Sequence, residues 1–459
     1  MPARRETHSY SACRGPPALA ATDGTWFLRW NSTVGSVHVR SLVKFPDIAA
    51  SVLDLSRTYH SWRPPVGLSV CVTGGGVGIR HLRLFYRLES MFATSSSSQD
   101  IAVIGAGVTG LTAALALQMA GYRVTLLDRH PFPTENTSAI AGGMLAPFSE
   151  CELLPSDYVR AGLRGIELWK VLLGDAYPDC LFENGSLVVC APEYATEFQS
   201  FANSLGDDTN AWQFVHADTI KTLEPHLAQS FDSGVLLPRE AHLVPDKTLK
   251  ALFEAFQDLD GKFRVRSADP AQLAQEYDRV IDCRGFVPGI DQDLFAVQGE
   301  IVIIHCPHVH LQRPLRIIRP DTPFYIVPRP GGEFAIGATA IAHADETEWR
   351  VRVSSAMTLL KFATDIVPAF YDARIVALHS GLRAAYPSLL PEIRSEADGR
   401  ILRLNGLYRH GYLLSPVMAA CVVNLIRGEP DSYAKLFTGL LNVPPIRLPE
   451  EAGGSVSIQ

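Results

Sequence analysis

Three glycines with the spacing Gly-x-Gly-x-x-Gly form the clearest chemical pattern in the sequence. Gly105, Gly107 and Gly110 follow an apolar run over 101–104 and lead into a helix-forming run over 111–120. In such a turn the first glycine permits the tight bend, the second lets the backbone approach a diphosphate, and the third lets helix and strand pack closely. Amides at the start of the helix then hold the phosphates. The pattern predicts dinucleotide binding.

An acidic residue completes this unit. Gly121 ends the expected helix, residues 122–127 form a second apolar strand, and Asp128 follows 18 residues after Gly110. A carboxylate at this point accepts hydrogen bonds from a ribose hydroxyl. The motif serves both NAD and FAD. Residues 137–147 are small and apolar enough to lie against a flat aromatic ring, but their composition fits equally well a loop packed under the sheet.

Composition bounds the class of protein. The 459 residues are 47% hydrophobic, which is enough for more than one core, so we expect two domains or a two-lobe unit. The eight cysteines lack metal-ligand or disulfide spacing, which predicts no metal site and favours a reduced, cytoplasmic compartment. No apolar window approaches the ~20 residues of a membrane-spanning helix.

Charge divides the chain into two parts. Residues 1–90 carry 11 Lys or Arg and 5 Asp or Glu, whereas the remaining 369 carry 30 and 43. The acidic main body argues against nucleic acid as a partner, because phosphates require a basic surface. Residues 1–90 show no sustained helix or strand period. They could be a transit segment, a small extra domain, or a disordered leader translated ahead of a true start at Met91, and we favour the last.

Later motifs occur in an order known from one family. Between about residue 99 and about residue 440 the chain resembles the D-amino-acid oxidase superfamily, and most closely the glycine oxidase of thiamine (thiazole) biosynthesis. Beyond the glycine turn, the resemblance is carried by the small, apolar segment over 138–147, Tyr-Ile-Val-Pro-Arg at 325–329, Gly-Ala-Thr at 337–339, Gly-Leu-Arg at 381–383 and the twelve residues from Asn405 to Pro416.

The resemblance implies an α/β fold with two lobes. A Rossmann-type lobe that binds FAD would be built from discontinuous segments, 99–180, 237–294 and 376–440. A substrate lobe with a mixed sheet would comprise 181–236 and 295–375, and 441–459 would form a tail. Residues 279–285 read as a buried strand ending in a glycine turn, and 185–190 and 299–304 read as strands of the substrate lobe.

Family membership would assign FAD contacts to residues in every segment of the first lobe. Leu413 to Ile426 reads as a helix with Ser415 at its N-cap and Pro416 at its first position, its positive end directed at the flavin. The expected FAD-binding residues are Gly105, Gly107, Val108, Gly110, Asp128, Ser138, Gly143, Met144, Gly285, Leu407, Arg409, His410, Gly411, Tyr412 and Leu413.

Three side chains are expected to act on the substrate. Arg383 matches the family's arginine whose planar guanidinium holds the substrate carboxylate through two hydrogen bonds, although Ala384 replaces the usual proline. Tyr325 matches a hydroxyl donor to the same carboxylate. Arg409 would add positive potential next to the flavin. His410 fits either a catalytic or a structural role.

The implied activity is FAD-dependent oxidation of glycine, or a similar small amino acid, to its imine. Hydride would pass from Cα to flavin N5 without a general base, and oxygen would be reduced to hydrogen peroxide. Alternatives are an oxidase or dehydrogenase for sarcosine or a D-amino acid with a different acceptor, and a flavin-binding protein without turnover. The amino acid and oxygen would be the partners, and a homo-oligomer is possible.

Overall fold

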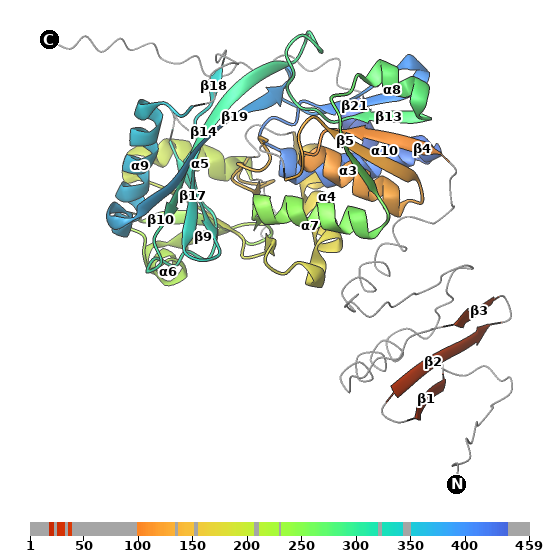
Figure 1. Cartoon of the computed structure of the whole chain (residues 1–459). Coiled ribbons are helices and arrows are strands. Elements are labelled where there is room, and N and C mark those ends of the chain that lie inside the picture. The colour runs from red at the N-terminus through yellow and green to blue at the C-terminus, as the bar shows by residue number, and fades with distance from the viewer. Residues whose placement is uncertain are drawn as a thin grey trace. The chain divides into compact units, whose positions relative to one another are not determined.

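The computed structural model describes residues 99–438, except 134–135, 151–154, 206–210, 229–230, 320–323 and 343–349, together with three strands nearer the N-terminus. The chain divides into two compact units, 1–83 and 84–459. In the first, an antiparallel sheet has the order β1 (Ala18–Thr22), β2 (Thr25–Ser32), β3 (Gly35–His38) (Figure 1). The rest of 1–90 and the expected tail lie outside the described residues, and the interpretation of the leader stays a prediction.

A six-stranded sheet forms the first lobe of the second unit. Its strands are parallel except for the last, and most residues of the inner strands are buried, as in parallel sheets that helices cover. The order is β12 (Lys262–Val265), β5 (Arg123–Asp128), β4 (Asp100–Ile104), β13 (Arg279–Asp282), β21 (Ile401–Asn405), β20 (Glu392–Glu396).

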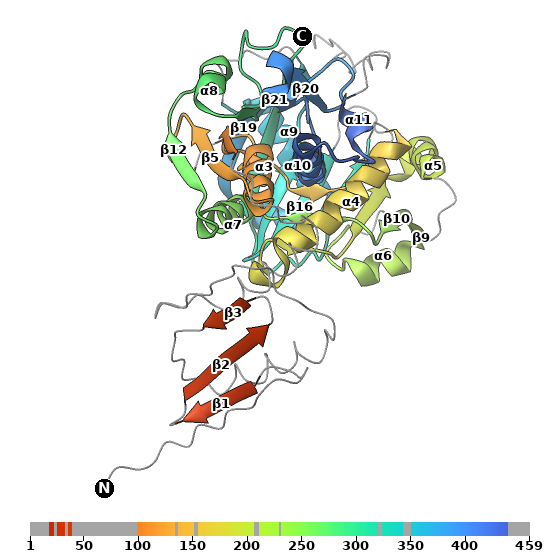
Figure 2. The same cartoon turned by 90° about the vertical axis from the view of Figure 1, so that its right-hand side faces the viewer.

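Helices from distant parts of the chain pack together beside this sheet. Figure 2 shows the central α10 (Gly411–Arg427) between α3 (Val108–Met119) and α4 (Ser156–Leu172), and both helices contact it. The other helices of this lobe are α7 (Pro245–Asp258), α8 (Pro270–Glu276) and α11 (Ala434–Thr438). The lobe is therefore built from discontinuous segments, as expected.

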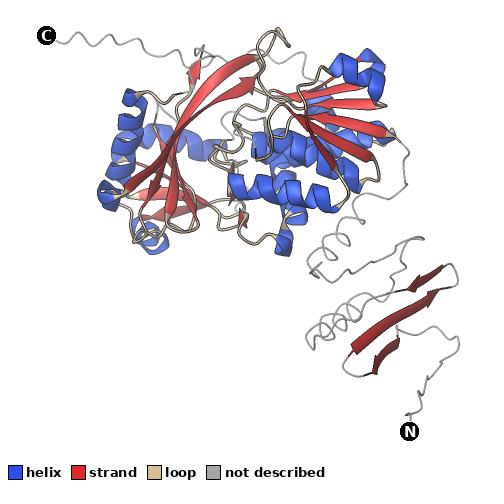
Figure 3. Ribbon diagram, in the orientation of Figure 1, coloured by secondary structure: helices blue, strands red, loops and turns tan. Residues whose placement is uncertain are grey.

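A nine-stranded mixed sheet forms the second lobe (Figure 3). Its pairs are antiparallel except β15 with β8, and α9 (Val353–Ile366) packs on it, as do α5 (Ala195–Ser204) and α6 (Ala217–Leu223). The order is β18 (Ile341–Ala342), β14 (Phe295–His305), β17 (Glu333–Gly337), β16 (Phe324–Arg329), β15 (Leu315–Ile318), β8 (Ser186–Cys190), β10 (Ser233–Leu237), β9 (Gln213–His216), with β19 (Arg374–Ala385) also on β14. The expected fold class is confirmed.

Short strands link the two lobes, and one boundary differs from expectation. β6 (Met144–Leu145), β11 (Ala241–Leu243) and β7 (Leu181–Phe182) form a small third sheet. The expected cofactor-lobe range from 376 begins inside β19, which pairs with β14 along its whole length. Residues 376–385 therefore belong to the substrate-lobe sheet, and Arg383 lies within β19. The other domain boundaries stay predictions.

The start of α10 also differs from expectation. The helix begins at Gly411, and Ser415 Oγ donates back to the Gly411 carbonyl, so Ser415 is not the N-cap. Pro416 lies inside the helix and has no amide hydrogen for the Tyr412 carbonyl one turn earlier. Trp169 of α4 supplies the missing donor, with Nε1 2.7 Å from that oxygen. The proline thereby creates the acceptor that joins α10 to α4.

This coupling is testable by a double-mutant cycle. Trp169→Phe should lower the free energy of unfolding by removing the hydrogen bond, worth ~1 to 3 kcal/mol when its partner is left buried, together with packing. In a Pro416→Ala background the restored amide can bond Tyr412, so the same change should cost less. Urea denaturation of the four proteins measures the difference. Equal costs in both backgrounds would show that Trp169 acts through packing alone.

Candidate active site

Two glycines of the turn after β4 have no room for a side chain. Gly105 has φ +100°, and a Cβ there would lie 2.7 Å from the Cys283 carbonyl oxygen. A Cβ on Gly110 would lie 1.7 Å from the Gly105 oxygen. Both positions require glycine because backbone from β13 and from the turn itself fills the space. The turn thus brings the first amides of α3 to the edge of the sheet.

Two side chains accept hydrogen bonds from backbone amides of the glycine turn and of the start of α3. The Val108 amide donates to Ser138 Oγ at 3.0 Å, and the Ala106 amide donates to Asp128 Oδ2 at 2.8 Å. Asp128 Oδ1 accepts from the His130 amide. Each carboxylate oxygen can accept a further hydrogen bond, so Asp128 is available to a ribose hydroxyl beside the turn. These residues fit the diphosphate and ribose of FAD.

Removing the Asp128 carboxylate tests this assignment. Asp128→Ala deletes one hydrogen bond to a charged group and should weaken FAD binding by ~1.5 to 3 kcal/mol. Titration of apoprotein with FAD, followed by flavin fluorescence, gives the dissociation constant. Asp365→Ala, an exposed position on α9, serves as the control. An unchanged constant for Asp128→Ala would mean that another group holds the ribose.

A cavity of about 150 Å³ is lined by elements of both lobes. Among the residues around it are Ile140 and Ala141 from the small, apolar segment and Gly299 of β14. Eleven of the expected site residues also line it: Val108, Ser138, Gly143, Met144, Tyr325, Arg383, Arg409, His410, Gly411, Tyr412 and Leu413. The fold therefore brings most of the expected site into one space.

The remaining expected residues are not among those that line this cavity. Gly105, Gly107, Gly110 and Asp128 form the turn described above, and Leu407 is buried in the apolar core.

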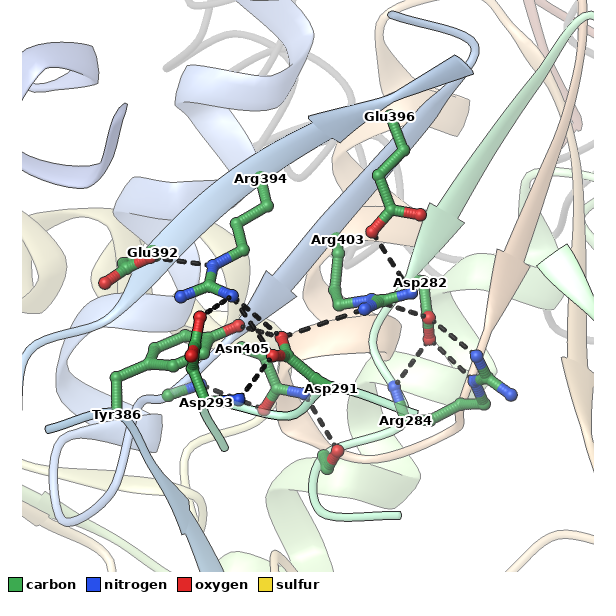
Figure 4. A network of polar contacts seen from close by, with 12 residues as sticks. Asp282, Arg284, Asp291, Asp293, Tyr386, Glu392, Arg394, Glu396, Arg403 and Asn405 are labelled. Atoms are coloured by element: carbon green, nitrogen blue, oxygen red, sulfur yellow. Dashed lines mark hydrogen bonds and ion pairs between the residues drawn. The ribbon is translucent and has the colours of Figure 1, made fainter. Parts of the chain in front are cut away.

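Gly285 lies in the turn after β13, where its carbonyl accepts from Asn405 Nδ2 at 2.8 Å. Figure 4 shows the charged network that fixes this turn to β20 and β21. Arg284 and Arg403 both bind Asp282, while Arg394 binds Asp291.

Tyr325 is clamped between glycines. A Cβ on Gly142 would lie 2.9 Å from its hydroxyl, and one on Gly337 would lie 2.6 Å from it. Burial raises the pKa of Tyr325 above its usual value despite the nearby Arg383 and Arg409. The phenol is therefore neutral and able to donate a hydrogen bond.

Arg383 is a partly buried cation without an acidic partner among the described residues. Its guanidinium lies on Gly299, where a Cβ would be 2.2 Å from Cζ, and its Nη1 donates to the Thr339 carbonyl at 2.9 Å. Burial lowers the pKa of Arg383, but a guanidinium keeps its charge at neutral pH. A charge partly removed from water favours a counter-charge, and the cavity that it lines can admit one.

Arg409, in contrast to Arg383, already has an acidic partner. Its Nη2 lies 3.2 Å from Glu150 Oε1, and Glu150 also lines the cavity. Burial opposes ionisation of Glu150, but the guanidinium groups of Arg409 and Arg316 outweigh it and hold the pKa of Glu150 below its usual value. Sequence reasoning missed Glu150, which follows directly after the small, apolar segment. Two acids in that position, Glu150 and Glu152, were the available signal.

His410 and Tyr412 have supporting positions. Burial lowers the pKa of His410 to about 4, so the imidazole is neutral at pH 7 and carries no charge for catalysis. The Tyr412 hydroxyl donates to the Ser138 carbonyl at 2.9 Å, joining the start of α10 to the segment that follows the cofactor turn.

Comparison with known proteins defines the class. The family model DAO, described as FAD dependent oxidoreductase, matches residues 100–425. The chain belongs to this family, and it is an FAD-dependent oxidoreductase. No group of three or more His, Cys, Asp or Glu within the described ranges could hold a metal ion, and no helix there is long and apolar enough to cross a membrane.

The similar proteins include one from thiamine biosynthesis. A protein of Rhizobium etli named as the thiamine biosynthesis oxidoreductase ThiO is 36% identical over 338 residues, covering 73% of this chain and 99% of its own. The glycine oxidase of Geobacillus kaustophilus is 24% identical over 73% of this chain and 94% of its own. A crystal structure of glycine oxidase from Geobacillus kaustophilus has a TM-score of 0.62 at 22% identity, covering 74% of this chain and 98% of its own, which supports the fold.

Proposed function

We propose that the protein oxidises glycine, or an amino acid of similar size, to its imine with FAD as the oxidant, and that oxygen is reduced to hydrogen peroxide. The observation that carries this proposal is Arg383, a partly buried cation that lines the cavity without an acidic partner among the described residues. A carboxylate is the anion whose geometry a guanidinium fork matches. The similarity to ThiO of Rhizobium etli supports a role in supplying thiamine biosynthesis.

The chain would bind and orient, and FAD would supply the redox chemistry by accepting a hydride. The glycine turn, Asp128 and Ser138 would hold the nucleotide part of FAD, and Gly143, Met144 and the start of α10 would lie along its ring system. Arg383 and the Tyr325 hydroxyl would bind the substrate carboxylate. Fixing that group in place directs Cα at one point of the cavity, and such orientation is the main contribution that a protein makes to hydride transfer.

Removing the carboxylate ligand tests the role of Arg383. Arg383→Ala should retain FAD but lose ~2 to 5 kcal/mol of transition-state binding for glycine, a factor of about 30 to several thousand in kcat/KM. Arg383→Lys should recover part of the loss, because an ammonium keeps the charge without the fork. Peroxide release gives the rates, and flavin absorbance gives the FAD content.

Glycinamide serves as the matched substrate for these variants because it lacks the carboxylate. It should lose far less activity than glycine on mutation of Arg383. Equal losses for glycine and glycinamide would assign Arg383 an indirect role and would make Arg409 the leading carboxylate ligand.

A substrate panel tests the activity itself. Under anaerobic conditions glycine should bleach the bound FAD faster than sarcosine or D-alanine, and readmitted oxygen should restore the flavin absorbance with release of peroxide. Faster bleaching by sarcosine or a D-amino acid would move the assignment to those substrates. Bleaching that only a quinone reverses would indicate a dehydrogenase. Absence of bleaching by every amino acid tested would indicate a flavin-binding protein without turnover.

A further inference from the structure

We propose that Glu150 binds the amino group of the substrate and that its negative charge stabilises the iminium cation formed as hydride leaves Cα. This inference rests on the proposed function, because it assigns the second half of an amino-acid site whose first half is Arg383. It makes Glu150 a catalytic residue that sequence reasoning did not identify.

The first observation is an unsatisfied oxygen. Glu150 Oε1 accepts from Arg409 Nη2, whereas Oε2 is shielded from solvent and has no hydrogen-bond partner in the part of the chain that the structure describes. An ionised oxygen in this state costs free energy unless a donor reaches it. Glu150 lines the same cavity as Arg383 and Tyr325. A ligand of this cavity that carries a hydrogen-bond donor, such as an amino group, would satisfy Oε2.

The second observation is the support beneath Glu150. Glu240 is fully buried, and its Oε1 accepts from the backbone amides of Phe148 and Ser149 at 2.8 and 2.7 Å. Its Oε2 accepts from Ser149 Oγ at 2.7 Å. These bonds fix the backbone immediately before Glu150, so the position of Glu150 does not depend on Arg409 alone. Glu240 is a positioning residue for this carboxylate.

Charge complementarity gives the third argument. The cavity holds two cations, Arg383 and Arg409, and one anion, Glu150, that influence one another electrostatically. An amino acid presents one carboxylate and one amino group. With the carboxylate on Arg383 and the amino group on Glu150, each charged group of the site has an opposite charge, and Arg409 keeps its own partner.

The chemistry uses the same carboxylate. After the substrate ammonium has lost a proton to solvent, the Cα–H bond breaks and its electron pair leaves with hydrogen to FAD. The nitrogen lone pair forms the C=N bond, and nitrogen becomes positive. A fixed negative charge beside that nitrogen is worth more in this state than with the neutral amine, so it lowers the barrier.

Binding of two small ligands separates amine recognition from carboxylate recognition. The FAD-loaded enzyme, reduced with dithionite under anaerobic conditions, cannot oxidise glycine, so calorimetry gives equilibrium dissociation constants for glycine and for acetate. Glu150→Gln should weaken the binding of glycine about 10- to 100-fold, because a charge-assisted hydrogen bond is lost. Acetate should bind as well as before or more tightly, because Arg409 loses its counter-charge. Glu167→Gln, an exposed position on α4, is the matched control.

A kinetic measurement distinguishes binding from catalysis. In stopped-flow experiments with oxidised enzyme and saturating glycine, the limiting rate of flavin bleaching should fall at least tenfold in Glu150→Gln. Glu150→Asp, which keeps the charge on a shorter side chain, should recover part of both effects. If Glu150→Gln does not retain FAD, the test uses Glu150→Asp alone. This variant should bind glycine more weakly than the wild-type enzyme, by a smaller factor, and should bind acetate with unchanged affinity.

Two results would overturn the inference. The first is unchanged affinity of Glu150→Gln for glycine. The second is an equal loss of affinity for glycine and for acetate, which would assign Glu150 only a role in holding Arg409. A different result would contradict the proposed function. If the wild-type enzyme binds glycine but glycine does not bleach the flavin, the proposed oxidase activity is wrong. The comparison of glycine with acetate would still test recognition of the amino group by Glu150.

Discussion

The ion pair between Glu150 and Arg409 is the interaction on which the rest of the site depends. Two arginines line one cavity, and without an acid between them their charges would repel. Because Glu150 neutralises Arg409, Arg383 is left as the guanidinium of the cavity that requires an external anion. In the proposed function the pair therefore leaves Arg383 as the arginine for the substrate carboxylate.

The fold builds this arrangement from segments that are far apart in the sequence. β14 and β19 bring Gly299 and Arg383 together, and α10 presents Arg409 and His410 at its start. Trp169 holds α10 through the carbonyl that Pro416 leaves without a donor. Glycines let the parts approach closely, since a Cβ on Gly142, Gly299 or Gly337 would collide with Tyr325 or Arg383.

Sequence reasoning succeeded where local patterns dominate. The glycine turn, its flanking strands and Asp128 follow from spacing alone, and the ordered motifs led to the family and the two-lobe fold. It failed where long-range packing decides. Ser415 and Pro416 read as a helix start, but α10 begins four residues before Ser415 because contacts with α4 satisfy the carbonyl that proline leaves free. Glu150 was missed because the acids after the small, apolar segment form no local motif, and because its partner Arg409 lies 259 residues away.

The central claim is that an anionic ligand binds to Arg383 and leaves the Glu150–Arg409 pair intact. A crystal structure of the FAD-loaded enzyme with bound acetate tests it most directly. The account predicts the carboxylate of acetate on the guanidinium of Arg383 and the hydroxyl of Tyr325, with Glu150 still paired to Arg409. Acetate bound to Arg409 with Glu150 displaced would contradict the account.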